Sequence, residues 1–304
     1  MTNVIGNTQA SEFIPEVWAN RALTKLEAEL HLAKNIARDS DFVATTVGSI
    51  VNIPKTGALT ANQKTAGTPV TLQNPTATGV NVTIDQHWEV SFIVDDVVKA
   101  QANQSVMDRY ITDGVIALAE KIETKLASLF DEATATKVNS GGGALEFADI
   151  RSMRTNLSTN RAPMTDRFLY LSPLATNDVI GMKDEADNLM FTDVSKYGTA
   201  QLIQDGELGK ILGFRVYESL FVQSDGSPAK EQNLYLHKNG MVLAMRPLPT
   251  PKAGGVQVAV VDKDGLMIRV LYSYNAQELG DQVTLDTLFG CKALRSELLG
   301  VVER

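Results

Sequence analysis

The sequence predicts an α+β fold, with long strands and one unusually long helix building two or three packed regions. Apolar and polar residues alternate at 80–94 and again at 256–270, which predicts strands with one packed face. Apolar residues recur every three or four positions from 104 to 133, and thirty helical residues would span roughly 45 Å. Between Pro54 and Gly79 the chain fits neither pattern and contains no aromatic residue.

The N-terminal part predicts a helix followed by a strand. Ser11 suits the N-cap, and Pro15 suits the first turn, where its missing N–H costs nothing. One apolar stripe follows at helical spacing: Leu23, Leu26, Leu30, Ala33 and Ala37. Residues 42–54 then predict a strand. Its candidate buried positions are Val47, Val51 and Ile53.

The polar segment from Pro54 to Gly79 has only Leu59, Val70 and Leu72 as large aliphatic residues. Such a segment buries too little apolar surface inside one subunit to compensate for the conformational entropy lost when it is ordered. Structureless connections longer than about 12–15 residues are uncommon in compact domains and usually functional or disordered. The segment therefore predicts an arm that becomes buried on another molecule, which points to an assembly protein rather than a self-contained enzyme.

A flexible break at 137–143 (KVNSGGG) predicts a domain boundary. The elements expected beyond it are a helix at 147–158, a buried strand at 167–171, a short helix at 173–182, and strand-rich stretches at 213–222 and 233–246. Asn239-Gly240 is a two-residue hairpin signal within the last of these. We therefore expect two strands to pair across that dipeptide.

The C-terminal part predicts a second hairpin and a final strand. Across Asp264-Gly265, Val256, Val258 and Val260 are expected to pair with Leu266, Ile268 and Val270. Val283 and Leu285 begin the last strand, which runs toward Phe289.

Composition excludes several classes of protein. The chain of 304 residues has 28 Lys and Arg against 36 Asp and Glu, and no two basic residues are adjacent, so a nucleic-acid-coating surface is not expected. A single cysteine excludes an internal disulfide and fits a reducing compartment. No apolar stretch approaches the ~18–20 residues of a membrane span, and the N-terminus lacks secretory features. We expect a soluble protein of the cytoplasm.

The sequence contains no constellation of catalytic residues. His31, His87 and His237 lie in unrelated segments without a metal-binding spacing. Cys291 lies in an apolar strand pattern, where cysteine usually behaves as a small hydrophobe. Asp262–Gly265 lacks the remaining ligands of a calcium loop, and Gly206–Gly213 lacks both phosphate-binding glycine patterns. We predict no catalytic residue, no metal site and no cofactor.

Several strings occur in an order that resembles one known family. They are Phe13-Ile-Pro-Glu-Val-Trp18 before a Leu/Ala-rich helix, Val51-Asn-Ile-Pro54, Val82-Thr-Ile-Asp85, Arg167-Phe-Leu-Tyr-Leu-Ser-Pro173, Gly209–Ser219 and Val283–Gly290. Together they resemble the major capsid (coat) proteins of tailed bacteriophages, which share the Hong-Kong-ninety-seven-type capsid fold. The resemblance covers most of residues 12–304.

The resemblance implies an architecture in five parts. These are an N-terminal arm (1–40), a strand and extended E-loop hairpin (41–79), a peripheral β-sheet domain (80–145) with the spine helix at 104–133, a compact axial domain (146–250), and return strands of the peripheral domain (251–304). The peripheral sheet would be shared by residues 80–98 and 256–304.

The resemblance also implies a function. A structural protein would self-assemble as hexamers and pentamers into an icosahedral shell around double-stranded DNA, without sequence-specific binding. Scaffolding and portal proteins are the other expected partners, no membrane is involved, and the virion capsid would assemble in the host cytoplasm. The expected intersubunit contacts are Pro54, Lys55, Leu59, Lys64, Val70 and Leu72 in the E-loop, and Phe13, Ile14 and Trp18 in the arm.

Three other functions stay open at this point. An encapsulin-type compartment uses the same fold to enclose a cargo enzyme. A cytoplasmic hydrolase would need Cys291 and a histidine brought together in space. A tail or decoration protein is usually β-rich, which the long helix argues against. Some capsid proteins cross-link an E-loop lysine to a neighbour's asparagine, but Lys55 and Lys64 are interpreted here as solvated lysines.

Overall fold

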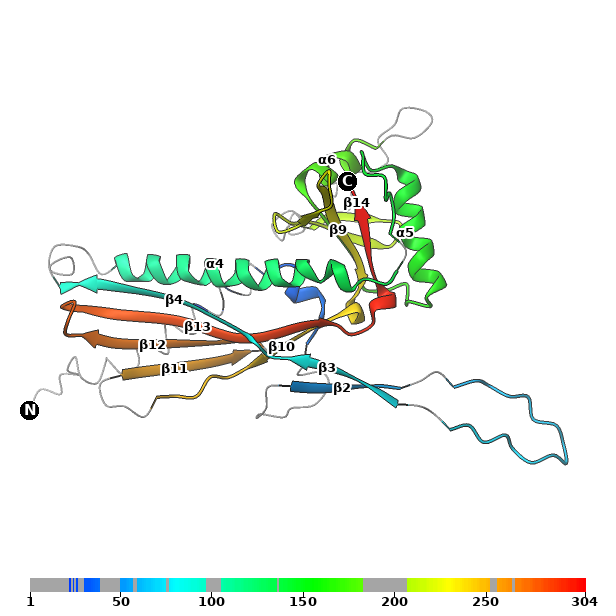
Figure 1. The fold of residues 1–304 in the computed structure, drawn as a ribbon, viewed down its shortest axis with the longest axis horizontal. Coiled ribbons are helices and arrows are strands. Elements are labelled where there is room, and N and C mark those ends of the chain that lie inside the picture. The colour runs from blue at the N-terminus through cyan, green and yellow to red at the C-terminus, as the bar shows by residue number, and fades with distance from the viewer. Residues whose placement is uncertain are drawn as a thin grey trace, which may run out of the picture.

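The computed structural model of the chain describes residues 22, 24, 26, 30–38, 50–56, 59–74, 77–96, 105–135, 137–182, 207–251, 256–263 and 266–304. Within them it forms two six-stranded sheets and a separate two-stranded hairpin. The molecule is elongated: the long helix α4 lies along one sheet, the second sheet stands at one end with its helices, and the hairpin projects beyond that same end (Figure 1).

The first sheet is built around β13 (Gly280–Ala293), a strand of 14 residues. One edge of β13 pairs with β4 (Gln86–Asp95), and the other pairs with β12 (Leu266–Asn275) and then β10 (Met241–Arg246). Two further strands complete the sheet: β11 (Val256–Lys263) beside β12, and the short β1 (Ala37–Arg38) beside β10. The pairing of β4 with β13 joins distant parts of the sequence, from Asp95 with Gly280 to Gln86 with Phe289.

The structure confirms the long helix that the spacing of apolar residues predicts. This helix comprises α4 (Ser105–Ala127), 23 residues long, followed by the tighter 3₁₀ turn η3 (Ser128–Glu132). Its buried apolar face consists of Ile111, Val115, Leu118, Ala119, Ile122 and Leu126. This face belongs to the same hydrophobic cluster as Val283, Leu285 and Phe289 of β13, so the helix is held by the first sheet along its length.

The second sheet has the strand order β14–β9–β5–β7–β6, with β8 added beside β9. Its strands are β5 (Arg167–Leu171), β6 (Glu207–Ile211), β7 (Phe214–Glu218), β8 (Gln223–Asp225), β9 (Lys230–His237) and β14 (Leu299–Glu303). Helices α5 (Phe147–Thr159) and α6 (Pro173–Ile180) pack against it. Both begin with a side-chain cap, a capping box at Glu146 and the Ser172 hydroxyl. The helices and the buried strand expected at 147–182 are confirmed.

Two strands lie in a different sheet from the one that their place in the sequence predicts. β10 falls within the range expected for the axial domain, yet it pairs with β13 of the first sheet. β14 falls within the expected return strands, yet it pairs with β9 of the second sheet. The 3₁₀ turn η6 (Ser296–Leu298) redirects the chain between β13 and β14. The chain therefore crosses between the two sheets at both places, before β10 and before β14.

The prediction of a hairpin at Asn239-Gly240 is wrong. Both edges of β9 are already paired, one with β14 and the other with β5 and β8, so β10 cannot join it. The dipeptide instead lies in the 3₁₀ turn η5 (Lys238–Gly240), where the His237 ring accepts a hydrogen bond from the backbone N–H of Asn239. This turn carries the chain from one sheet to the other.

The hairpin expected across Asp264-Gly265 forms, but the residues that oppose Leu266, Ile268 and Val270 lie one position away from the expected valines. Lys263 pairs with Leu266, so Ala259 opposes Val270 and Val261 opposes Ile268. A shift of one residue moves every side chain to the opposite face of a strand. Buried Ala259, rather than Val258 or Val260, therefore shares the core-facing side with Val270.

The segment at 30–38 ties the long helix to the second sheet. The buried Glu123 carboxylate of α4 accepts hydrogen bonds from the backbone N–H groups of Leu32 (3.0 Å) and Ala33 (3.1 Å). Burial raises the pKa of Glu123 to about 7, although these backbone donors partly oppose the rise. From β5, the Tyr170 hydroxyl donates to the His31 carbonyl at 3.2 Å. One hydrophobic cluster accordingly includes residues of α4 and of both sheets.

Some expectations fall on residues outside those that the structure describes. They include Ser11, Pro15 and Val47, whereas Val51 and Ile53 are buried as the alternation predicts. In the described part of the chain, no helix is both long enough and apolar enough to cross a membrane.

Candidate functional site

The strongest candidate site is the hairpin of β2 (Ile50–Thr56) and β3 (Ala77–Thr83), which pair antiparallel along their full length (Figure 1). At its base, Val51, Ile53 and Val82 are buried against the first sheet. The other residues of this cluster include Val242 and Ala244 of β10 and Leu294, which directly follows β13. The base is thus anchored by apolar packing, while the strands lead away from the body of the molecule.

A glycine of β13 sets the position at which the hairpin leaves the sheet. A Cβ atom on Gly290 would lie 2.1 Å from the Thr83 carbonyl oxygen and 2.9 Å from the Ile84 Cα atom. Backbone atoms cannot move aside as the end of a side chain can. Only glycine therefore lets the connection from β3 to β4 cross this closely over β13.

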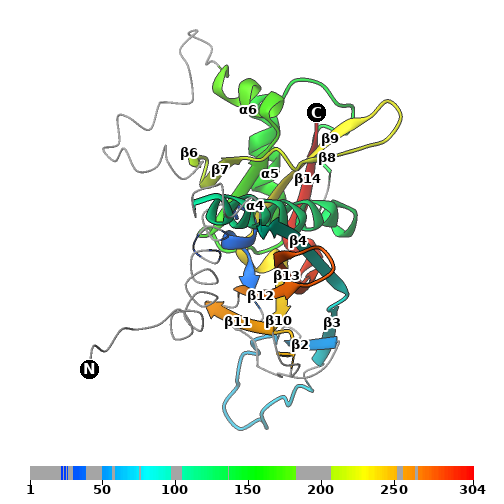
Figure 2. The ribbon, with the colours of Figure 1, turned by 90° about the vertical axis from the view of Figure 1, so that its left-hand side faces the viewer.

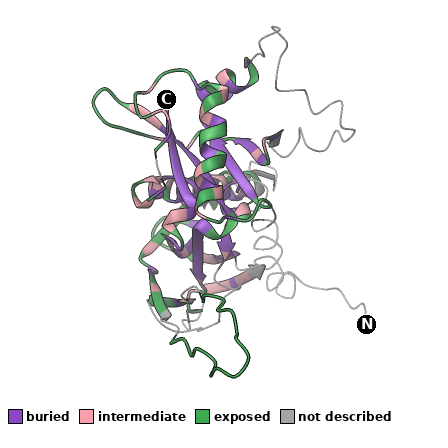
Figure 3. Cartoon of the chain, turned by 90° about the vertical axis from the view of Figure 1, so that its right-hand side faces the viewer, coloured by how far each residue is buried: buried purple, intermediate pink, exposed green. Residues whose placement is uncertain are grey.

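The described loop beyond the paired strands, residues 59–74, is exposed throughout (Figure 3). Leu59 and Val70 are each 67% exposed and Leu72 is 89% exposed. Thr60 and Gln73 form reciprocal hydrogen bonds across the loop, and Thr68 bonds to Thr65 at its tip, where Gly67 has φ +84°. These contacts shape the loop but bury none of its aliphatic side chains.

The two lysines of this segment lie in different surroundings. The Lys55 ammonium lies 2.8 Å from the Glu297 carboxylate, where both side chains are partly exposed. Partial burial opposes ionisation of Glu297, yet the bond from Lys55 contributes to a pKa below the usual range. Lys64, in the exposed loop, donates to the Thr65 carbonyl at 3.0 Å. Lys55 therefore fastens the hairpin base, and Lys64 lies near the tip.

The predicted contact residues are only partly brought together. Pro54, Lys55, Leu59, Lys64, Val70 and Leu72 all lie on this one projecting hairpin. Pro54 pairs with Gly79 in β2 and β3. Phe13, Ile14 and Trp18 lie outside the described residues. That any of these residues contacts another subunit stays a prediction at this point.

The remaining sites that could carry chemistry have structural explanations. Burial raises the pKa of the Cys291 thiol to about 12, so the thiolate that a hydrolase would need is scarce at neutral pH. His87 Nε2 lies 3.1 Å from Asp286 of the first sheet. Among the residues that the structure describes, no group of His, Cys, Asp and Glu could hold a metal ion.

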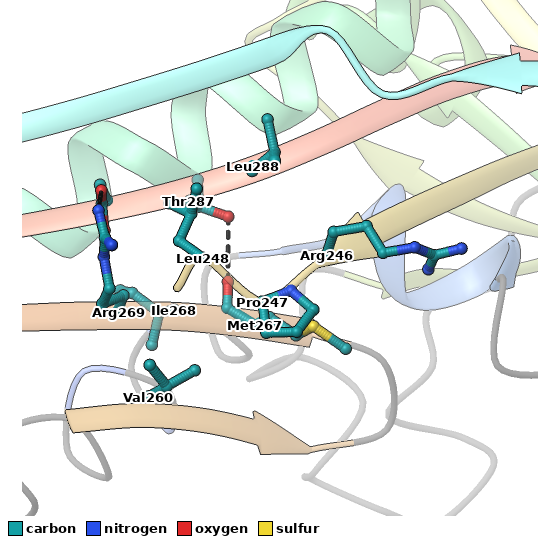
Figure 4. A pocket seen from close by; sticks show the side chains of 10 residues that line it. Arg246, Pro247, Leu248, Val260, Met267, Ile268, Arg269, Thr287 and Leu288 are labelled. Atoms are coloured by element: carbon teal, nitrogen blue, oxygen red, sulfur yellow. Dashed lines mark hydrogen bonds and ion pairs between the residues drawn. The ribbon is translucent and has the colours of Figure 1, made fainter. Parts of the chain in front are cut away.

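A pocket lies between β10, β11, β12 and β13 (Figure 4). Three of the polar side chains that line it have partners: Arg269 forms an ion pair with Asp286, and the Thr287 hydroxyl donates to the Met267 carbonyl at 3.0 Å. Arg269 also donates to the Pro249 carbonyl at 2.6 Å, which fastens the proline-rich segment after β10. We interpret this pocket as a packing contact.

Comparison with known proteins identifies the fold. The capsid of Ralstonia phage GP4 matches with a TM-score of 0.64 and 12% identity over 91% of this chain and 90% of that one. A structure from Mycobacterium phage Che8 matches with a TM-score of 0.60 and 21% identity over 90% of both chains. The capsid of a native GTA particle matches with a TM-score of 0.58 and 13% identity over 90% and 89%.

No protein-family model matches the sequence, and the comparison with curated proteins gives no match. The structural matches nevertheless span about 90% of the chain on both sides. The chain therefore has the α+β capsid fold of tailed phages, which confirms at the level of the fold what the sequence resemblance implies.

Proposed function

We propose that this chain is a major capsid protein, which self-assembles into the icosahedral shell that encloses the DNA genome of a tailed phage. The single observation that carries the proposal is the projecting hairpin, with Leu59, Val70 and Leu72 exposed on a molecule of capsid fold. The few exposed aliphatic side chains of such a polar loop become buried when a second subunit covers it.

The proposal explains why the single subunit leaves such surface uncovered. Fully burying one aliphatic side chain is worth about 1.5–3 kcal/mol, so the hairpin alone supplies a modest contact. Each subunit would make several contacts at once, and the closure of a symmetric shell compounds them. Weak individual contacts also let a misplaced subunit dissociate before the shell closes.

Hexamers and pentamers of the chain, in a virion capsid assembled in the host cytoplasm, follow from the same proposal. So do the expected scaffolding and portal partners and the enclosed double-stranded DNA. The net charge of −8 supports DNA that is enclosed without sequence-specific binding, because an acidic wall repels phosphate.

The test is electron microscopy of the purified protein, with and without a coexpressed scaffold. The wild type should form closed particles or ring capsomers. Replacing Leu59, Val70 and Leu72 together by serine should abolish particles without unfolding the subunit, since all three side chains are already exposed. The matched control, Leu59→Met with Val70→Ile and Leu72→Met, keeps the apolar area and should still assemble.

A wild-type chain that stays monomeric under every assembly condition contradicts the proposal. Particles that enclose a cargo enzyme in place of DNA would favour the encapsulin-type compartment instead.

A further inference from the structure

The outward face of α5 lies on the side of the molecule from which the hairpin projects (Figures 1 and 3). This face borders an open hollow of about 700 Å³. The hollow is lined by Phe147, Arg151, Arg154, Thr155, Ser158, Thr159, Met164 and Leu212. No acidic residue is among them, although acidic residues outnumber basic ones in the chain, 36 to 28.

The composition of the hollow is that of a contact surface between proteins. Met164 is 61% exposed, and the Arg151 guanidinium lies 5.7 Å from the centre of the Phe147 ring. Arginine, methionine and aromatic residues are enriched at the buried centres of protein interfaces. The apolar residues would gain from being covered, and the two exposed guanidinium groups select for a partner with negative charge.

A third arginine beneath the hollow adds to its positive charge. Arg167 is only 1% exposed and donates to the carbonyls of Pro163 (2.7 Å) and Ala162 (2.8 Å). Its remaining bond goes to the Ser158 hydroxyl at 3.2 Å. All three acceptors are neutral, so this buried charge is solvated without being cancelled.

Ser158 lies between the buried arginine and the hollow. Its oxygen accepts from the Arg167 guanidinium, so its own proton is directed elsewhere, and Ser158 lines the hollow. Burial, with a smaller contribution from the nearby Arg154, lowers the pKa of Arg167. The site therefore offers hydrogen-bond donors backed by positive charge, which suits carboxylate oxygens.

We propose that the hollow on α5 is a docking site for a carboxylate-bearing surface of a second copy of this chain. The inference rests on the proposed function, because the copy that covers the hairpin would also approach α5 on that side. A second copy brings surplus carboxylates, and the apolar residues of the hollow favour a folded protein surface over a phosphodiester backbone.

The test compares two charge-reversed variants of the full chain. Arg151→Glu with Arg154→Glu should raise the concentration needed for assembly by about tenfold or more. The new glutamates would face carboxylates of the second copy, so attraction across the interface would become repulsion. The control, Arg109→Glu with Lys292→Glu, makes the same change of charge at exposed positions away from the hollow and should assemble close to wild type. Circular dichroism and thermal unfolding show whether each subunit is folded.

A second measurement reads the hollow directly. In a Thr155→Cys variant, the rate of maleimide labelling should fall about tenfold or more between the free subunit and the assembled particle, because interface centres exclude water and solutes. Equal labelling rates, or unchanged assembly of the Arg151/Arg154 variant, would overturn the docking site while leaving the shell function intact.

Two other outcomes also overturn the inference. A charge-reversed variant that assembles normally but retains less DNA would assign the hollow to nucleic acid instead. A wild-type chain that does not assemble at all removes the proposed function and the docking site with it.

Discussion

The carboxylate of Asp286 lies inside the first sheet, only 2% exposed, and receives two charged hydrogen bonds from Arg269. Replacing Arg269 by methionine leaves that carboxylate buried without its cation. Loss of one partner of a buried ion pair costs about 3–5 kcal/mol, so we expect the free energy of unfolding to fall by roughly that amount. Urea denaturation monitored by far-ultraviolet circular dichroism measures it.

The matched control for this prediction is Lys55→Met, which removes the more exposed ion pair with Glu297. Exposed pairs contribute about 0–1 kcal/mol, so this variant should unfold almost like the wild type. Equal effects of the two substitutions would show that the Arg269 bond to Asp286 is not a buried charge pair in solution.

The stability of the fold should also depend on pH through Glu123. The pKa of Glu123 rises from 4.5 to about 7 on folding, so the folded state binds this proton more tightly than the unfolded chain. Stability from this group is therefore complete below about pH 4.5 and is lost as the pH rises through 7. The shift corresponds to a fall of about 3 kcal/mol over that interval.

Urea denaturation at a series of pH values between 4.5 and 8 measures this dependence. Because other groups also titrate there, the informative quantity is the difference between the wild type and Glu123→Gln. The variant should lose this part of the slope, because glutamine does not titrate and resembles the neutral carboxyl group that Glu123 carries at low pH. Parallel curves would mean that Glu123 titrates alike in the folded and unfolded chain.

Among the elements, the hairpin depends on how closely β13 approaches the turn from β3 to β4. A methyl group on Gly290 would overlap the Thr83 carbonyl oxygen at 2.1 Å, so Gly290→Ala should destabilise the chain by about 1–3 kcal/mol. The effect should be seen in thermal unfolding and in faster amide exchange of β2 and β3. Gly141→Ala, where an added Cβ meets nothing within 4 Å, is the control and should change little. A Gly290→Ala chain with wild-type stability would exclude the close crossing.

The elements also show how far the sequence can be interpreted. The stripe from Ile111 to Leu126 and the mostly apolar β5 predicted their elements correctly, because the periodicity and apolar content of a segment are local properties. The polar composition of 54–79 likewise predicted a segment that its own subunit leaves exposed. What failed was strand partnership at β10, β14 and Asn239-Gly240. Pairing depends on which edges other strands already occupy, and local sequence does not record that.

The α5 hollow was missed for a similar reason. Arg151 and Arg154 are separated from Met164 and Leu212 in the sequence, and only the fold gathers them around one hollow. In the sequence alone, the two arginines are simply part of a scattered set of basic residues. The i, i+3 spacing of the two arginines on the expected helix at 147–158 was the one local signal available.

Across the whole molecule, the two sheets share a hydrophobic cluster with α4, whereas the hairpin loop lies outside that cluster. This contrast leads to a prediction for limited proteolysis. Trypsin should cut the free subunit after Lys64, because the loop is exposed and its hydrogen bonds are all short-range or within the loop. In assembled particles a second subunit should cover the loop and slow cleavage of the Lys64–Thr65 bond by about tenfold or more, since proteolysis follows the accessible population.

Mass spectrometry of the Lys64–Thr65 bond over time separates this cut from any other. Lys64→Gln removes the site and shows that loss of the intact chain arises there. Protection that appears only in particles, and disappears when they are dissociated, would come from neighbouring subunits rather than from a rearranged loop. A free subunit that resists cleavage after Lys64 would mean that the hairpin folds onto its own body, which contradicts both the exposed loop and the assembly that we infer from it.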